Sequence, residues 1–94
     1  MNPHDTPPTY KVIFSPHFEE IIFKLDKKDK ALLEKIQNQL IKLLRNPELG
    51  KPLRNVLRNR RRVHINPFVL VYEINRTEIE ILDFDHHDKI YKKY

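Results

Sequence analysis

The sequence contains no cysteine and only one glycine among its 94 residues. Without cysteine, the chain can form neither a disulfide bond nor a thiolate metal site. A single glycine excludes the glycine-rich loops that hold nucleotide phosphates. The longest apolar run is too short to cross a bilayer, and the first residues lack the apolar stretch of a signal peptide. We therefore expect a cytoplasmic protein with no membrane partner.

Acidic residues are absent from a quarter of the chain, the segment from Leu49 to Tyr72, although the sequence has 13 of them. The same segment holds His64 and six of the 18 lysine and arginine residues. This concentration of positive charge, in a chain of net charge +5, favours an anionic partner such as nucleic acid. The six basic residues are Lys51, Arg54, Arg58, Arg60, Arg61 and Arg62.

The length predicts one domain with a modest hydrophobic core. Residues 1–8 are polar and rich in proline, so we expect a disordered lead-in before a single domain over 9–94. Hydrophobic periodicity then predicts the elements. These are a strand over 9–14, a helix over 16–25, a second helix over 26–46, and strands over 60–65, 68–74 and 78–84. The order predicts an α+β fold in which an antiparallel sheet packs on a helical hairpin.

The helix boundaries are predicted from capping residues. Ser15 is expected to cap the first helix, with Pro16 at its first position. Asp26 interrupts the apolar pattern and is expected to cap the second helix, with Asp29 in its first turn. Asn46 and the proline after it should end that helix.

The strand over 60–65 alternates between polar and apolar side chains. Because neighbouring residues of a strand point to opposite faces, Val63 and Ile65 should face the core. Arg62 and His64 should then project together from the other face. Arginine binds phosphate oxygens through its several donors, and histidine transfers protons near neutral pH. The pattern therefore predicts a phosphate-binding surface.

Four segments in this order resemble the RelE/ParE superfamily of toxins from toxin–antitoxin operons. The segments are Tyr10–Phe18, Leu53–Arg58, Arg61–Ile74 and Glu80–Tyr91. The resemblance implies a RelE-like fold, similar to microbial ribonucleases, in β-α-α-β-β-β order. RelE-type members cleave messenger RNA, commonly on the ribosome, and are held inactive by a RelB-type antitoxin in a hetero-oligomer. Relatives of the ParE branch poison DNA gyrase instead.

The resemblance also implies site residues. The paired basic positions of the family fall on Arg62 and His64, and its C-terminal cluster falls on His86, His87 and Tyr91. We expect Arg62, His64, His87 and Tyr91 to be catalytic. We expect phosphate or RNA contacts from Lys51, Arg54, Arg58, Arg60, Arg61 and His86. An arginine that clamps phosphate in RelE-type enzymes is replaced by Val69.

These residue types suit RNA cleavage without a metal or other cofactor. Cleavage needs a base for the 2′-hydroxyl proton, an acid for the leaving 5′ oxygen, and cations beside the developing phosphorane charge. Histidine can serve in either proton role, arginine can bind phosphate, and Tyr91 can stack on a base or donate a proton.

Two other functions stay open at this stage. Val69 is also compatible with a protein that binds an antitoxin or nucleic acid and does not cut RNA, or with a gyrase inhibitor. In addition, a metal-dependent site would draw on the carboxylates and imidazoles near the C-terminus. These are Asp83, Asp85, His86, His87 and Asp88. Metal sites usually take their ligands from several elements, so no metal ligand is predicted.

Overall fold

The computed structural model describes residues 9–53 and 59–94. The predicted lead-in 1–8 and the predicted phosphate contacts Arg54 and Arg58 lie outside these residues. The elements are β1 (Lys11–Phe14), α1 (Pro16–Lys28), α2 (Lys30–Arg45), η2 (Pro47–Leu49), β2 (Lys51–Pro52), β3 (Arg60–Ile65), β4 (Phe68–Asn75), β5 (Glu78–His86) and α3 (His87–Lys93). Among the described residues, no helix has the length and apolar character needed to cross a membrane.

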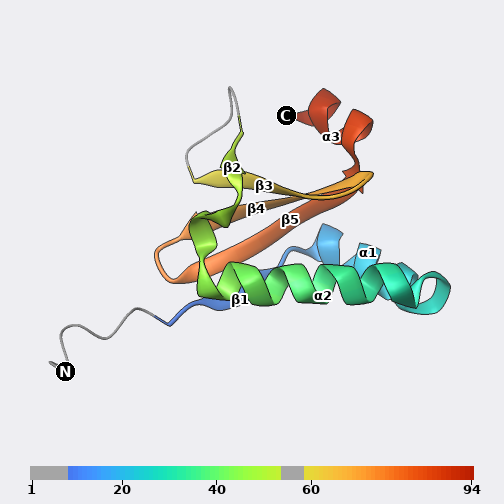
Figure 1. The fold of residues 1–94 in the computed structure, drawn as a ribbon, viewed down its shortest axis with the longest axis horizontal. Coiled ribbons are helices and arrows are strands. Elements are labelled where there is room, and N and C mark those ends of the chain that lie inside the picture. The colour runs from blue at the N-terminus through green and yellow to red at the C-terminus, as the bar shows by residue number, and fades with distance from the viewer. Residues whose placement is uncertain (1–8, 54–58) are drawn as a thin grey trace, which may run out of the picture.

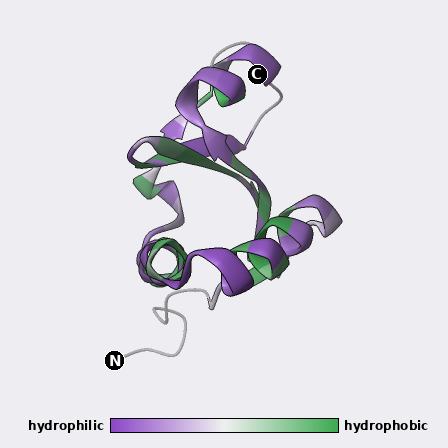
Figure 2. Ribbon diagram, turned by 90° about the vertical axis from the view of Figure 1, so that its right-hand side faces the viewer, coloured by the Kyte–Doolittle hydropathy of each residue, from purple (hydrophilic) through white to green (hydrophobic). Residues whose placement is uncertain are grey.

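One sheet separates two helical layers (Figure 1). Its strand order is β1-β5-β4-β3-β2, with β1 parallel to β5 and every other pair antiparallel. The hairpin of α1 and α2 covers one face, while α3 lies on the opposite face (Figures 1 and 2). The predicted α+β fold, with a mainly antiparallel sheet on a helical hairpin, is confirmed.

The boundary between the two long helices differs from the prediction. Ser15 caps α1 as expected, since its Oγ accepts the amide of Phe18 at 3.1 Å. However, α1 continues to Lys28, and Asp29, not Asp26, caps α2 by accepting the amide of Leu32 at 3.0 Å. Asp26 fits within α1 because it lies on its exposed side. The apolar periodicity of the sequence did not indicate which of these two aspartates caps the second helix.

The structure also contains three elements that were not predicted. No element was predicted after the last strand, but residues 87–93 form α3. Asp88 lies in its first turn and Lys92 and Lys93 in its last, which suits the helix dipole. No element was predicted between the second helix and β3, but Pro47–Leu49 form η2, and Lys51 and Pro52 form β2 and pair with β3. All three elements are short and depend on tertiary contacts that a local pattern does not reveal.

The core has two parts because β4 is buried on both faces. Figure 2 shows hydrophobic residues along the central strands. The larger cluster lies between the sheet and the hairpin. Its members are Phe18, Ile36, Leu43, Val63, Ile65, Leu70, Tyr72, Ile79, Ile81 and Phe84. The smaller cluster joins Val69 and Val71 of β4 to Ile90 of α3. This second cluster fixes α3 on the face that carries Arg62 and His64.

The fully buried Tyr72 connects the sheet to the segment that follows α2. Its hydroxyl donates to the carbonyl of Pro47 at 2.6 Å and accepts the amide of Gly50 at 2.9 Å. Burial raises the pKa of Tyr72. Gly50 packs so closely that an added Cβ would lie 2.6 Å from the carbonyl oxygen of Arg62. The single glycine therefore allows the chain to approach β3 closely just before β2 begins.

Replacing Tyr72 by phenylalanine should lower the free energy of unfolding by about 1–3 kcal/mol, because two buried backbone groups lose their partner. Urea denaturation measures this loss. Tyr10→Phe is the matched control, since the Tyr10 hydroxyl makes no hydrogen bond among the described residues. Equal stability of the two variants would contradict the proposed role of the Tyr72 hydroxyl.

Candidate functional site

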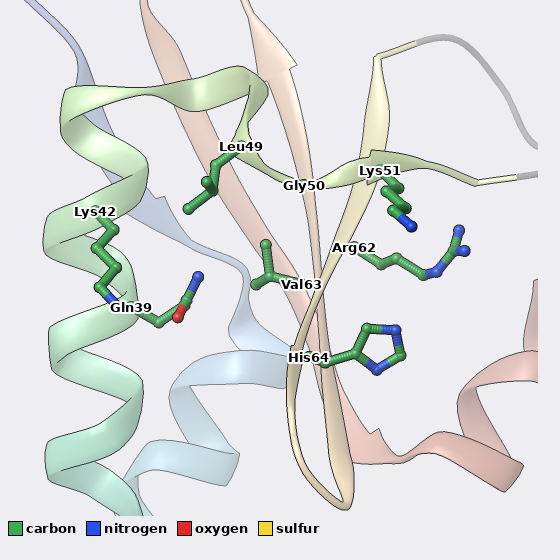
Figure 3. Close-up of a pocket in the computed structure, with 8 residues that line it drawn as sticks. All are labelled: Gln39, Lys42, Leu49, Gly50, Lys51, Arg62, Val63 and His64. Atoms are coloured by element: carbon green, nitrogen blue, oxygen red, sulfur yellow. The ribbon is translucent and has the colours of Figure 1, made fainter.

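The candidate site lies where β3 meets α3. Arg62 and His64 project from the same side of β3 (Figure 3), as the alternation predicted. Tyr91 of α3 reaches both: its hydroxyl lies 3.5 Å from His64 Nε2, and its ring lies 5.6 Å from the Arg62 guanidinium carbon. His64 and Tyr91 are both exposed, Tyr91 by 45%. A guanidinium, an imidazole and a phenol therefore meet on an open surface.

Arg62 is held in place but keeps unused donors. Its Nη1 donates to the carbonyl of Pro52 at 3.0 Å, which ties it to β2. Its Nε is buried and has no acceptor within residues 9–53 and 59–94. Because a guanidinium carries five N–H groups, donors of its two terminal nitrogens remain for a phosphate. Lys51 lies directly across the β2–β3 pair from Arg62 and is exposed, so a second cation stands beside it.

The other two arginines of β3 have structural contacts. Arg61 Nη1 donates to the carbonyl of Gly50 at 2.7 Å, which secures the turn before β2. Arg60 Nε lies 3.5 Å from a carboxylate oxygen of Glu73, and its guanidinium carbon lies 5.9 Å from the ring of Tyr94. Both residues were predicted to contact phosphate. The structure shows them already engaged with their own chain.

His86 and His87 lie at the start of α3, where the cap geometry positions them. His87 Nδ1 lies 2.8 Å from a carboxylate oxygen of Asp88, and the two imidazole rings are 4.4 Å apart. His86 Nδ1 accepts the amide of Asp88 at 3.3 Å. In the described part of the chain, neither histidine forms a hydrogen bond or ion pair with Arg62, His64 or Tyr91. The structure therefore unites three of the four residues that were predicted to be catalytic.

The residues of the alternative metal site divide into two groups. His86, His87 and Asp88 place potential ligand atoms within 4.8 Å of one another. Asp83 and Asp85 instead face Lys93, at 3.0 and 3.5 Å. The three clustered residues are consecutive and already form contacts with one another. The five residues considered from sequence thus do not converge on one point.

Val69 lies opposite His64 in the β3–β4 register and is fully buried. It packs in the same cluster as Ile90 of α3. An arginine at this position would have to displace that packing before it could reach a phosphate. Valine in place of the family's arginine therefore allows α3 to pack on β4 through Ile90.

Asp83 anchors the far end of α3. Its carboxylate, 5% exposed, lies 3.0 Å from Lys93 Nζ and 3.0 Å from His17 Nε2. The hydrogen bond to Asp83 raises the pKa of Lys93. Burial, and then the charge of Asp83, raise the pKa of Tyr94. These contacts hold the helix that presents Tyr91 to His64.

Asp83→Asn should therefore loosen α3 and lower the free energy of unfolding. We expect a loss of about 1–3 kcal/mol, towards the lower end because Lys93 is 43% exposed. Denaturation with urea measures it. The matched control is Asp85→Asn, since Asp85 lies farther from Lys93, at 3.5 Å. Each of the two carboxylates also accepts the amide of the next residue at 2.8 Å, so this local bond is common to both variants. If the Asp83→Asn protein were as stable as this control, Asp83 would not anchor α3.

The same anchor predicts a pH dependence. The charged form of Lys93 is favoured in the folded state, so its contribution is complete below about pH 10. It should be lost as the pH rises through the raised pKa of Lys93. The stability difference between the wild type and Asp83→Asn should therefore shrink above about pH 10. A difference that stays constant across this range would contradict the ion pair as its source.

Leu53, Lys93 and Tyr94 were not predicted from the sequence to belong to this region, and Asp83 was considered only as a metal ligand. Leu53, Arg62, Tyr91 and Tyr94 line a hollow of about 220 Å³ between the β2 segment and α3. The sequence did contain an indication of a helix here, because Ile90 and Tyr94 are four residues apart and would share one helical face. The helix itself had to be recognised before that spacing had a meaning.

Comparison with known proteins gives consistent matches over most of the chain. The family model described as "ParE toxin of type II toxin-antitoxin system, parDE" matches residues 12–91. A protein of Methanocaldococcus jannaschii named "Putative toxin RelE4" is 40% identical over 87 residues, covering 89% of this chain and 93% of that protein.

Two solved structures share the fold. The Staphylococcus aureus YoeB dimer has a TM-score of 0.75 at 27% identity, covering 84% of this chain and 98% of that one. The E. coli DinJ-YafQ toxin-antitoxin complex has a TM-score of 0.73 at 16% identity, covering 88% and 98%. The second likeness concerns the fold alone.

Proposed function

The chain belongs to the ParE toxin family of type II toxin–antitoxin systems, and within the wider RelE/ParE superfamily we propose that it is an endoribonuclease of the RelE type. The resemblance to the RelE/ParE superfamily seen in the sequence is thereby confirmed. The proposed activity is cleavage of messenger RNA on the ribosome, in the cytoplasm, which stops translation. The observation that carries it is the meeting of Arg62, His64 and Tyr91 on one open surface.

The proposed reaction is an attack within the RNA strand. His64 takes the proton of a 2′-hydroxyl, and the 2′ oxygen attacks the neighbouring phosphorus. The bond to the 5′ oxygen breaks, and this oxygen receives a proton from Tyr91 or from the imidazolium of His64. Arg62 stabilises the charge on the phosphoryl oxygens. The products are a 2′,3′-cyclic phosphate and a 5′-hydroxyl, and no step calls for a metal or other cofactor.

His87 was expected to be catalytic, but because it is not bonded to this group of three among the described residues, we propose that it contacts the RNA beside them. It lies on α3 with Tyr91, so a strand bound across the helix can reach it. Lys51 supplies a further phosphate contact beside Arg62. His86, at the start of α3, is also proposed to contact the RNA. The two structural arginines, Arg60 and Arg61, then contribute positive potential around the site, not direct contacts.

We also propose a RelB-type antitoxin as the partner in a hetero-oligomer. The support is an apolar groove of about 390 Å³ beside β1, an edge strand of the sheet. Its apolar lining residues are Val12, Phe14, Leu40, Ile41 and Leu44. Ile41 and Leu44 are 51% and 39% exposed, which suits the apolar side of an extended, amphipathic peptide. Co-expression with the neighbouring gene and affinity purification should yield a complex. A monomer without affinity for that product would reject the partner.

A second candidate function is inhibition of DNA gyrase or binding without cleavage. The buried Val69 favours it, since this residue replaces the arginine that clamps phosphate in RelE-type enzymes. The two functions differ in what is damaged. Induction of a ribonuclease should leave cut messages on ribosomes, seen by primer extension. Induction of a gyrase poison should leave messages intact and disturb supercoiling. Intact messages at an expression level that arrests growth would reject the ribonuclease.

A further inference from the structure

Three hollows follow one another along the outer edge of β3. The first, between α3 and β3, contains Arg62 and Tyr91 and measures about 220 Å³. The second, of about 320 Å³, contains Arg62 and His64 and extends to α2 (Figure 3). The third, of about 340 Å³, lies between His64 and α2. Each hollow shares a lining residue with the next, so the three hollows are neighbours in a path from Tyr91 past the candidate site to α2.

One flank of α2 forms the far wall of this path. Four of its residues line the second and third hollows, and their spacing of three, four and seven residues places them on one face. They are Lys35, Asn38, Gln39 and Lys42, and we call them the α2 stripe. The opposite flank, with Leu40, Ile41 and Leu44, lines the apolar groove beside β1. The two flanks of α2 therefore have different chemistry and suit different partners.

We propose that the α2 stripe is a second RNA-binding site, which holds the sugar-phosphate backbone of the single strand next to the cleavage position. This inference rests on the proposed function and extends it. The site at Arg62 and His64 would bind the scissile phosphate, and the stripe would bind the chain that leads to or from it.

The chemistry of the lining matches an RNA backbone. Two ammonium groups can pair with phosphates, and two amides can bond to phosphate or sugar oxygens. No carboxylate lines either the second or the third hollow. Glu34 is the single acidic residue of α2, and it is not among these lining residues. A polyanion would therefore meet no carboxylate in these two hollows, whose charged lining residues are lysines and Arg62 and whose apolar ones are Leu49, Val63 and Ile65.

The geometry leaves room for a strand. Lys35 and Lys42 are seven residues apart on a helix, which corresponds to about 10 Å along its axis. Within the described residues, β2 pairs with β3 only at Arg61 and Arg62, so no strand covers the outer edge of β3 at residues 63–65. His64 borders both the candidate site and the stripe across this edge.

The test compares Lys35→Glu/Lys42→Glu with the control Lys24→Glu/Lys30→Glu. Both variants make the same change in net charge, and the control lysines are exposed residues of the same helical hairpin outside the path. The probes are a three-nucleotide RNA that spans only the cleavage position and a 12-nucleotide single strand with a 2′-deoxy residue there. The stripe variant should bind the long RNA at least 10-fold more weakly than the control. Its cleavage of the short RNA should match that of the control.

Salt dependence provides a second readout. For a single strand, losing two lysine–phosphate contacts should reduce the slope of log affinity against log salt by about 1.4, so Lys35→Ala/Lys42→Ala should show this change and Lys24→Ala/Lys30→Ala should not. An RNA hairpin of equal length serves as a competitor. Preference of the stripe for the hairpin would overturn the assignment to a single strand, and equal loss of affinity in stripe and control variants would overturn the site. If the wild type cleaves neither the short RNA nor a message on programmed ribosomes, the proposed activity fails. The binding comparison still tests whether the α2 stripe binds RNA.

Discussion

Alanine in place of His64 is expected to slow RNA cleavage by about 10²–10⁴-fold, the usual contribution of a positioned acid or base. The imidazole lies 3.5 Å from the hydroxyl of Tyr91, so the two groups can exchange proton roles across one phosphate. Histidine suits this role because its ordinary pKa of about 6.5 allows it both to take and to give a proton near neutral pH. Single-turnover cleavage measures the rate without interference from product release.

The fold should survive this change, because His64 is exposed on its strand and such substitutions usually change stability by less than about 0.5 kcal/mol. Thermal melts serve as the control. His87→Ala is a matched variant on α3, where no hydrogen bond or ion pair with His64 is present among the described residues. We expect a smaller loss there. A folded His64→Ala protein that cleaves at nearly the wild-type rate would remove His64 from the chemistry.

Arg62→Ala should lower the cleavage rate by about 10²–10³-fold, by analogy with the loss of an oxyanion donor. The guanidinium is held by the carbonyl of Pro52 and lies 5.6 Å from the ring of Tyr91, so it is positioned before RNA binds. Arg62→Lys should restore only part of the rate, since an ammonium cannot form the two parallel bonds of a guanidinium.

Arg60→Ala is the matched control for Arg62→Ala. It removes the same charge from the same strand, but its guanidinium is engaged with Glu73 and Tyr94. If general positive potential were all that mattered, the two variants would lose the same activity. Equal rates for Arg60→Ala and Arg62→Ala would therefore contradict a specific role for Arg62 at the phosphate.

Much of the fold was predictable because local patterns agree with the tertiary structure. The apolar run of β4 indicated a central strand, and Val69, Leu70, Val71 and Tyr72 are fully buried. The alternation of β3 correctly placed Arg62 and His64 on one face. Ser15 and Pro16 defined the start of α1. In each case the residue type and its spacing were sufficient to predict the structure.

The rest of the fold depends on contacts between distant segments. Asp26 and Asp29 are both suitable caps, and only the observed backbone turn at Asp29 separates the two helices. The seven residues of α3 are too few to form a stable helix alone, so its presence depends on Ile90 packing against β4 and on Lys93 binding Asp83.

The candidate site was predictable in part for the same reason. Arg62 and His64 share one strand, so their spacing was sufficient to place them together. Tyr91 was placed beside them only by the resemblance to a family, and its contact depends on the docking of α3. The structural roles of Arg60 and Arg61 could not be seen, because their partners Glu73 and Gly50 lie on other segments.

The chemistry at the ends of the RNA fragments tests the central proposal most directly. A message bound to programmed ribosomes is treated with the wild-type protein in a single turnover, and the new termini are analysed. Attack by the 2′ oxygen with His64 and Arg62 at the phosphate predicts fragments with a 5′-hydroxyl and a 2′,3′-cyclic phosphate, absent with His64→Ala. Fragments with a 5′-phosphate, or equal cleavage by the variant, would contradict this mechanism.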